Sequence, residues 1–542
     1  MTVSESQPLL CDVVAAPTMA ELRARRTAVE NAGPAGGAGA DLIELRLDTV
    51  DRPDVAAALQ GRRRPVLVTC RATWEGGHFK GSEDERQRIL REALEAGAEY
   101  VDIEWKAQGV DRWLRPEDRS RVVLSYHDFE RMPSDLAGVV REMRATGSGV
   151  VKVAARAKAL RDLLPLLEVG RAQAAGAGGQ RTVLIAMGMS GVASRILAAH
   201  FRSCWTYAGP AVAPGQIEAS RLLNEFRFRS ITPRTQVYAV VGQPIAHSIS
   251  PAMHNAAFAA EGIDAVYIPC EAVDFDDFLA LAEILPIVGA SVTAPFKLDA
   301  YERGEAMDDD VKQVGAANTL RLKASVNGSG SAWESRNTDV AGFMAPLPSR
   351  MTLRGARAAI LGTGGAARAV AVGLGAAGAI VTVHARNTTS GAEVAALANG
   401  SVRAWGGPSD PLGLDGSGEA AAAGTRDAAW DLLVNTTPIG TFPAVMETPI
   451  EALTRARAGQ LTGRVAYDLV YNPRPTRMLR DAAAAGCATL DGLDMLVEQA
   501  ARQFEWWTGR RPSTEVMRAA AERRLIEMSA EETADESAIT QR

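Results

Sequence analysis

The residue that first suggests chemistry in this sequence is Lys152, which lies in the stretch SGVVKVAARAK (148–158). The valines around it predict a β-strand. Only seven of the 59 basic residues are lysines, and arginine supplies the others. Lysine can lose its proton and act as an amine nucleophile, which arginine cannot do. Taken alone, a strand lysine more often points to solvent, so the elements around Lys152 have to decide between the two interpretations.

Apolar, β-rich runs recur along the first 210 residues. Helical patterns separate several of them: in PSDLAGVVREMRATG (133–147), apolar residues follow helical spacing, and we expect Ser134 to cap the start and Gly147 to end the helix. Eight strand–helix units in about 225 residues predict an α/β fold of the (β/α)8 barrel type. The predicted strands are residues 9–15, 41–47, 64–70, 99–105, 121–127, 149–155, 181–187 and 203–208.

Polar residues stand at the ends of the predicted barrel strands, where the chemistry of such barrels is found. His127 and Lys152 end consecutive parallel strands, so a right-handed crossover makes them neighbours. Arginines nearby favour the neutral form of Lys152 and can bind an anionic substrate. This arrangement predicts a Schiff-base enzyme that removes a proton next to a carbonyl. The polar residues at these ends are Glu44, Arg46, Arg71, Glu104, His127 and Lys152.

The first half resembles type I 3-dehydroquinate dehydratase in six motifs, LIELRLD, VTCRATWEGG, SYHDFE, VKVAARAK, MGMSGVASR and APGQ, which occur in order. The resemblance implies that Lys152 forms an imine with the substrate ketone, that His127 takes the C2 proton, and that Glu75 orients His127. The sequence departs from the family at Val212, where a serine or threonine is usual, so one hydroxyl contact to the substrate is missing. The resemblance also implies that the substrate is bound by Glu44, Arg46, Arg71, Arg195 and Gln216.

The second half begins after a polar, proline-containing boundary at residues 224–236. A strand there leads to a turn with two serines and then to a helix, and a serine pair before a helix is more often an N-cap than a ligand site. A second candidate lysine follows in GASVTAPFK, and GAANT and NTD add further polar side chains. The residues in these motifs are Ser248, Ser250, Thr293, Lys297, Asn318, Thr338 and Asp339.

A glycine-rich turn occurs within RAAILGTGGAARAVAVGLGAAGAIVTVHAR (357–386), which has the pattern of strand, turn, helix and strand. In that setting the glycines permit a tight turn and let a pyrophosphate approach the helix N-terminus. The next strand ends at Arg386 with no acidic residue for a ribose 2′-hydroxyl, which favours NADP over NAD. The expected cofactor-binding residues are Gly362, Gly364, Gly365, Ala366, Ala367, Arg386, Asn435 and Thr436.

Residues 237–510 resemble shikimate dehydrogenase in the motifs HSISP, SVTAPFK, GAANT, NTD, GTGGAARA, YDLVYNP and GLDMLVEQAARQ. The resemblance implies that Lys297 and Asp339 are the catalytic pair; whether Lys297 donates a proton or stabilises charge stays open. The sequence departs from the family at Ser335-Arg336, where Gly-Tyr is usual, and at Ser390, where a second basic residue is often found. The substrate-binding residues that the resemblance implies are Ser248, Ser250, Thr293, Asn318, Thr338, Tyr471, Gln499 and Gln503.

Composition limits the class of protein. The net charge of −6 gives no basic surface for nucleic acid. Five scattered cysteines without a CxxC motif favour a reducing compartment and predict no metal site. We find neither a signal peptide nor a run of about 18 apolar residues, so we expect no membrane span and a cytoplasmic protein.

The predicted organisation is a barrel over residues 1–228 and a two-lobed α/β dehydrogenase. Its substrate-binding domain spans 236–347, completed by helices at about 490–525, and a Rossmann NADP-binding domain spans 348–489. A Gly/Ala-rich insertion is expected at 406–427, and a disordered acidic tail at 527–542.

The two resemblances concern successive reactions, because the product of the first, 3-dehydroshikimate, is the substrate of the second. We therefore expect a bifunctional shikimate-pathway enzyme that ends with shikimate, in the domain order of the fused plant enzymes. One alternative is a dehydrogenase half that prefers quinate. The other is a non-catalytic sensor of the quinate pathway, which should lack Lys152 or the pair Lys297 and Asp339.

Overall fold

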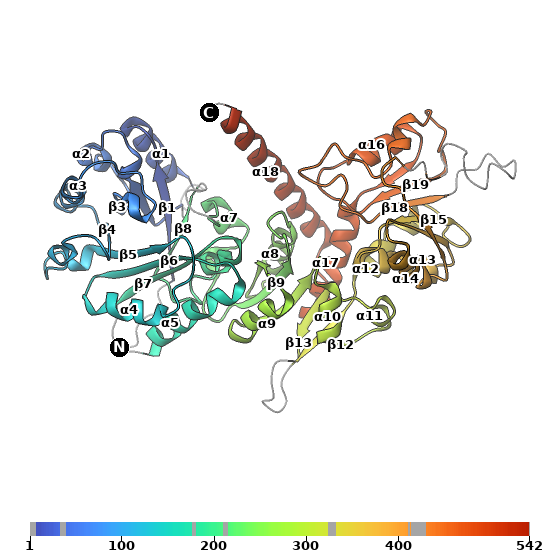
Figure 1. The fold of residues 1–542 in the computed structure, drawn as a ribbon, viewed down its shortest axis with the longest axis horizontal. Coiled ribbons are helices and arrows are strands. Elements are labelled where there is room, and N and C mark those ends of the chain that lie inside the picture. Colours follow the sequence, from blue (N-terminus) through green and yellow to red (C-terminus); the bar gives the residue numbers. More distant parts are fainter. Residues whose placement is uncertain are drawn as a thin grey trace. The chain divides into compact units, whose positions relative to one another are not determined.

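The computed structural model describes residues 7–32, 39–175, 180–209, 215–323, 332–409, 412 and 430–540, except for the side chains of 174–175 and 532–540. Val212 and most of the predicted insertion at 406–427 lie outside the described residues. The chain forms two compact units, Met1–Pro251 with Ile263–Ile287, and Ala252–Gly262 with Val288–Arg542. Figure 1 shows their helices and strands.

The first unit contains the predicted barrel, an eight-stranded sheet in which neighbouring strands pair in parallel. The strand order is β7-β6-β5-β4-β3-β2-β1-β8, and the N–H of Cys204, just before β8, donates to the carbonyl of Thr182 in β7. The prediction of a (β/α)8 barrel is therefore confirmed. The strands are β1 (Leu9–Ala15), β2 (Leu42–Arg46), β3 (Val66–Thr69), β4 (Tyr100–Glu104), β5 (Val122–Asp128), β6 (Val150–Arg156), β7 (Arg181–Met187) and β8 (Trp205–Ala208).

Helices follow the strands, and several begin at polar caps. Helix α3 starts with a capping box in which Ser82 and Glu85 each accept a backbone N–H of the other. Helix α4 begins one residue later than predicted, because Asp135, and not Ser134, accepts the N–H of Gly138. The barrel helices are α1 (Met19–Asn31), α2 (Val55–Leu59), α3 (Glu83–Glu95), α4 (Leu136–Ala145), α5 (Leu164–Ala175), α6 (Val192–Ile196) and α7 (Ala219–Asn224).

The first unit also includes a short segment of the second half of the sequence. Strands β9 (Gln236–Gly242) and β10 (Ala265–Glu271) pair in parallel, and helix α9 (Phe275–Ile284) follows. Asp274 caps α9 by accepting the N–H of Asp277. These elements pack with the barrel, although the sequence assigns them to the dehydrogenase.

The second unit contains a mixed sheet in which β11 and β14 are antiparallel to β13, and β12 is parallel to β14. Helix α12 packs on α17. The strands are β11 (Ile287–Val292), β12 (Gly304–Ala306), β13 (Thr319–Leu322) and β14 (Trp333–Arg336). The helices are α8 (Ser250–Ala260), α10 (Lys297–Arg303), α11 (Asp309–Val314), α12 (Asp339–Met344), α17 (Gly492–Thr508) and α18 (Thr514–Thr540).

A parallel six-stranded sheet of order β17-β16-β15-β18-β19-β20 completes the second unit. This is the doubly wound order of a Rossmann fold, with its switch point between β15 and β18. The strands are β15 (Arg357–Leu361), β16 (Ile380–Ala385), β17 (Ser401–Ala404), β18 (Leu432–Asn435), β19 (Val465–Asp468) and β20 (Ala488–Leu490), and its helices include α13 (Gly365–Ala376), α14 (Thr388–Ala396) and α16 (Arg477–Ala484).

The C-terminal segment differs from the prediction. Helix α18 continues to Thr540, whereas we expected disorder from residue 527. The expectation came from the acidic charge and the scarcity of apolar residues, but alanine and glutamate are also strong helix formers. Within the described residues, no helix is long and apolar enough to cross a membrane.

Candidate active sites

A cavity in the barrel is lined by every catalytic and substrate-binding residue that we predicted for the first site. It lies at the carboxyl ends of the strands, where the sites of such barrels are found. Its lining includes Glu44, Arg46, Arg71, Glu75, His127, Lys152, Arg195 and Gln216, together with Met187 and Tyr207. Lys152 is 5% exposed, so the interpretation of this lysine as a solvent-facing strand residue is wrong.

Asp102 is the partner of Lys152 that sequence reasoning missed. Its Oδ2 lies 3.1 Å from Lys152 Nζ and 2.8 Å from an Arg71 nitrogen, and its Oδ1 accepts the Ser125 hydroxyl at 2.6 Å. It is fully buried, and the neighbouring cations keep its pKa well below the usual range despite the burial. The sequence did carry a signal for Asp102. It lies two residues before Glu104, so its side chain is on the same face of β4 as that of Glu104.

The ammonium of Lys152 also lies over an aromatic ring. Its Nζ is 4.4 Å from the centroid of the Tyr207 ring. A ring face attracts a cation, and more strongly where water is excluded. Asp102 and Tyr207 together stabilise a positive charge at Nζ, either on the free lysine or on an iminium.

His127 and Glu75 form a buried pair in which His127 Nδ1 lies 2.8 Å from Glu75 Oε2. Burial, followed by the charges of Arg71 and Lys152, holds the pKa of His127 well below its usual value. Burial also raises the pKa of Glu75 to about 8, against the lowering effect of Arg71. With the hydrogen on Nδ1, the neutral imidazole presents Nε2 as a proton acceptor.

The depressed pKa of His127 predicts where dehydratase activity is lost in acid. In the predicted mechanism the neutral ring is the base, so kcat/KM should fall only when the pH drops through the pKa of the folded enzyme. Because that pKa is lowered, the acid limb should lie below the ordinary value of 6.5. A pH profile of kcat/KM for dehydration measures this, and an acid limb centred at or above 6.5 contradicts it.

Arg195 is a buried cation suited to a substrate anion. It is 2% exposed on α6, and burial lowers its pKa to about 10. Among the described residues it forms no ion pair with an acidic side chain, whereas Arg46 is paired with Asp48 at 2.8 Å. A buried cation without a counter-ion is costly unless a ligand supplies the charge, so Arg195 fits its predicted role as the carboxylate contact.

The second unit brings together six of the residues predicted for the other site. Lys297 Nζ lies 2.5 Å from Asp339 Oδ2, and Asn318 donates to Asp339 Oδ1 at 2.7 Å. Because Asn318 holds one carboxylate oxygen, the other is directed at the lysine. The connected residues are Lys297, Asn318, Thr338, Asp339, Gln499 and Gln503.

The other residues predicted to bind the substrate have fewer described contacts with this site. Ser250 donates its backbone N–H to Ser248 Oγ at 3.3 Å in the turn that starts α8. Thr293 lies in the turn between β11 and α10, where its carbonyl accepts the N–H of Phe296. The described contacts do not connect these residues or Tyr471 with Lys297, and their binding roles stay predictions.

Ser291 is a residue of this site that sequence reasoning missed, and it donates to Gln503 at 2.6 Å.

The glycine-rich turn joins β15 to α13, as predicted. Gly362 has φ +108°, a conformation that side chains rarely adopt, and a Cβ there would lie 2.7 Å from Thr436 Oγ1. At Gly364 a Cβ would meet nothing within 4 Å, so the backbone there is open to a pyrophosphate.

Two other predicted cofactor residues lie after strands of the same sheet or at their ends. Arg386 is exposed just after β16. Asn435, at the end of β18, is fully buried and donates to Asp468 at 2.9 Å, so its side chain stabilises the loop that follows β18.

Gly365 packs against Lys297, the lysine predicted to be catalytic. A Cβ there would lie 2.9 Å from Cδ of Lys297 and 3.4 Å from its Cβ. Gly365→Ala should therefore displace Lys297 and lower kcat of the dehydrogenase by about 10- to 100-fold, since misplacement of about 1 Å is that costly. Steady-state kinetics at saturating shikimate and NADP measures this. The matched variant Gly364→Ala, where space is open, should affect KM for NADP more than kcat, and equal losses of kcat in both variants contradict the packing argument.

The fold and the two sites define the class of protein: a (β/α)8-barrel lyase with a buried lysine in its cavity, joined to a Rossmann-type oxidoreductase. Family models agree with this division. Type I 3-dehydroquinase matches residues 14–233, the shikimate dehydrogenase substrate binding domain matches 240–320, and the shikimate 5′-dehydrogenase C-terminal domain matches 492–522.

One relative matches most of the sequence, and others match about half of it. The chain is 32% identical to the chloroplastic bifunctional 3-dehydroquinate dehydratase/shikimate dehydrogenase of Arabidopsis thaliana over 503 residues, 87% of this chain and 78% of the relative. It is 42% identical over 292 residues to a shikimate dehydrogenase (NADP(+)) of Symbiobacterium thermophilum, covering 53% of this chain and 93% of that one. A crystal structure of a shikimate dehydrogenase with NADP+ is 29% identical and covers 54% of this chain and 97% of its own, with a TM-score of 0.46. The chain belongs to the family of bifunctional 3-dehydroquinate dehydratase/shikimate dehydrogenases.

Proposed function

We infer that this chain dehydrates 3-dehydroquinate to 3-dehydroshikimate in its barrel and reduces that product to shikimate with NADPH in its second half. The observation that carries this inference is that each half brings a lysine together with its predicted catalytic partners. Lys152 lies in a cavity with the pair His127 and Glu75, and Lys297 is bound to Asp339. A non-catalytic sensor is not favoured because it should lack one of these lysines. A preference for quinate is not favoured either, since the relatives are shikimate dehydrogenases.

In the dehydratase, the neutral amine of Lys152 attacks the substrate ketone, and loss of water gives an iminium. The iminium draws electrons and acidifies the adjacent carbon, so that His127 can remove the C2 proton. The same histidine then returns a proton to the departing hydroxyl, and hydrolysis of the imine releases the product and the lysine. Asp102 and Tyr207 hold the cationic nitrogen, and Arg195 binds the substrate carboxylate.

In the dehydrogenase, the bound nicotinamide supplies the hydride that reduces the ketone. Lys297 faces the oxygen on which negative charge develops, and Asp339 holds the ammonium in place. Asn318 fixes the carboxylate of Asp339, so the pair is oriented before the substrate binds. The residues also fit NADP: the open backbone at Gly364 suits the pyrophosphate, and the exposed Arg386 suits the 2′-phosphate.

Arg386 is the residue that should recognise the 2′-phosphate of the cofactor. Arg386→Ala should weaken the binding of NADPH far more than that of NADH, because only NADPH carries a 2′-phosphate that can pair with the arginine. A charge-assisted hydrogen bond is worth roughly 1.5–3 kcal/mol, or about 10- to 150-fold. Comparing KM for the two cofactors measures this difference, and an equal loss with both would show that another group binds the phosphate.

Steady-state rates test the function as a whole. The purified chain should dehydrate 3-dehydroquinate without any cofactor and should oxidise shikimate with NADP, and quinate or NAD should give lower kcat/KM. Dehydration without shikimate oxidation, or a higher kcat/KM with quinate, would overturn the assignment of the second half.

We also propose the domain division given above, with a barrel to residue 228, a substrate-binding domain at 236–347 and a Rossmann domain at 348–489. The barrel sheet and the separate parallel sheet of β15–β20 support its first and last parts. The scattered free cysteines support a cytoplasmic location, and the negative net charge supports small-molecule partners over nucleic acid. Cell fractionation followed by immunoblotting tests the location.

A further inference from the structure

The strand that carries Lys152 is followed by a turn whose backbone N–H groups are bound by a side chain from outside the barrel. After β6 the chain forms the turn η5 (Leu160–Leu163), which continues into α5. The first N–H groups of a helix have no partner within the helix. Here the N–H groups of Leu160 and Arg161 donate to the two carboxylate oxygens of Asp277, at 2.9 and 2.8 Å.

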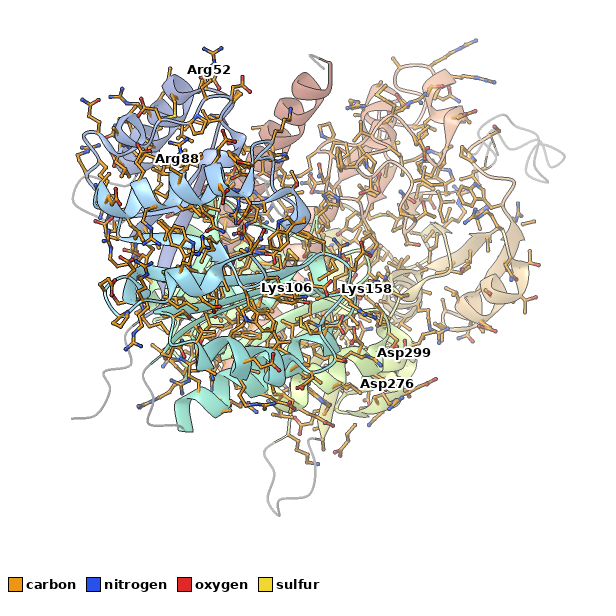
Figure 2. The ribbon with its side chains drawn as sticks, turned by 60° about the vertical axis from the view of Figure 1, so that its left-hand side comes forward. Arg52, Arg88, Lys106, Lys158, Asp276 and Asp299 are labelled. Carbon is orange, nitrogen blue, oxygen red and sulfur yellow. The ribbon has the colours of Figure 1, made fainter. Side chains whose placement is uncertain are left out.

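Asp277 lies on α9, in the part of the sequence assigned to the dehydrogenase. Its side chain is fully buried and also accepts Arg161 Nε at 2.9 Å and the N–H of Val273 at 3.2 Å. The N-cap of α9 is supplied by Asp274. Most bonds of the Asp277 carboxylate therefore serve the barrel, and a negative charge at a helix N-terminus is favourable. Figure 2 labels Lys158, just before the turn, and Asp276, the neighbour of Asp277.

The capped segment is connected to the dehydratase cavity by a backbone hydrogen bond and by close backbone contacts. The N–H of Ala157 donates to the carbonyl of Met187 at 2.9 Å, and Met187 lines the cavity. The space at Gly188 is closed by the carbonyl of Ala157, since a Cβ would lie 3.1 Å from it. A Cβ at Gly215 would in turn lie 2.4 Å from the carbonyl of Gly188, so the backbone beside Gln216 rests on this turn.

A second contact reaches the same rim. Strand β10, which precedes α9, contacts the turn η6 (Met189–Gly191) and helix α6. Helix α6 carries Arg195, the buried arginine suited to the substrate carboxylate. Elements of the dehydrogenase half thus support two neighbouring parts of the barrel rim, the segment after Lys152 and the helix of Arg195.

We propose that Asp277 is a positioning residue of the dehydratase site, although it belongs to the half of the chain that performs the reduction. By capping the turn after β6, it fixes the rim on which the backbone around Gly188 and Gln216 rests. The proposal rests on the dehydratase activity inferred above. It means that the barrel needs the dehydrogenase half for its substrate affinity.

Hydrogen exchange gives the direct test, in the full chain. In Asp277→Asn an amide N–H faces a backbone donor, so exchange of the peptide containing Leu160 and Arg161 should become about tenfold faster, as expected for a lost hydrogen bond to a charged group. Asp276→Asn removes the same charge from an exposed neighbour and serves as the matched control. Unchanged exchange in Asp277→Asn overturns the capping, whereas faster exchange throughout the chain overturns a local role.

Kinetics of the same variants test the consequence. The parent chain must first dehydrate 3-dehydroquinate, which tests the function separately. Asp277→Asn should then raise KM for 3-dehydroquinate about tenfold and change kcat less, while kcat and KM for shikimate stay near the parent values. Equal losses in both activities would show a general structural role and overturn the proposal, as would a dehydratase KM equal to that of Asp276→Asn. Arg161→Ala, which leaves the two backbone bonds in place, should give a smaller rise than Asp277→Asn, and an equal rise would assign the effect to the ion pair.

Discussion

Lys152→Arg should abolish the dehydration of 3-dehydroquinate while the same chain continues to oxidise shikimate. An imine needs an amine that can lose its proton, and the guanidinium of arginine stays charged at any working pH. The substitution keeps the positive charge beside Asp102 and over the Tyr207 ring, so it removes the nucleophile and leaves the electrostatics of the cavity similar. Spectrophotometric assays of both reactions on one preparation make the dehydrogenase the internal control for folding.

Chemical trapping gives independent evidence for the same lysine. Borohydride added with 3-dehydroquinate or its product should reduce the iminium to a stable adduct, which mass spectrometry should locate in the peptide that contains Lys152. The adduct should be absent from Lys152→Arg, and it should not form at Lys297, which faces the same ketone without attacking it. An active Lys152→Arg enzyme, or an adduct at another lysine, would exclude the Schiff-base mechanism.

Lys297→Ala should lower kcat of the dehydrogenase by about 10²- to 10⁴-fold, the usual contribution of a positioned acid–base group. KM for shikimate should change less, because the largest contribution of the ammonium arises as charge develops on the reacting oxygen. Steady-state kinetics with shikimate and NADP measures both constants. Dehydratase turnover should be unchanged, since its catalytic groups belong to the other compact unit.

Asp339→Asn distinguishes the two roles left open for Lys297. An amide can still hold the lysine through its oxygen but cannot exchange a proton with it. A loss of kcat comparable to that of Lys297→Ala favours proton transfer through the pair, and a small loss favours electrostatic stabilisation by the ammonium alone. If Lys297→Ala instead raises KM and preserves kcat, Lys297 only binds the substrate.

The sequence by itself determined the architecture and most of the chemistry. Strand periodicity and turn residues are local, so the eight barrel strands and the glycine-rich turn after residue 361 could be predicted before any contact was known. The ends of parallel strands meet at one edge by geometry, which predicted that His127 and Lys152 are neighbours. The resemblance of the surrounding motifs to shikimate dehydrogenase then implied that Lys297 and Asp339 form the second pair, and the structure places Lys297 Nζ 2.5 Å from Asp339 Oδ2.

Only the tertiary structure decided which further groups act on those residues. In the sequence Asp102 is a charged residue within an apolar strand, and its bond to Lys152 exists because β4 and β6 both direct side chains into the barrel interior. The stem of Lys297 occupies the space beside Gly365, although the two residues belong to motifs far apart in the chain. Asp277 resembles an ordinary residue in the first turn of a helix, yet its carboxylate caps a turn more than 100 residues earlier in the chain. Such contacts join segments distant in sequence, and neither local periodicity nor motif spacing carries information about them, because they depend on how completed elements pack.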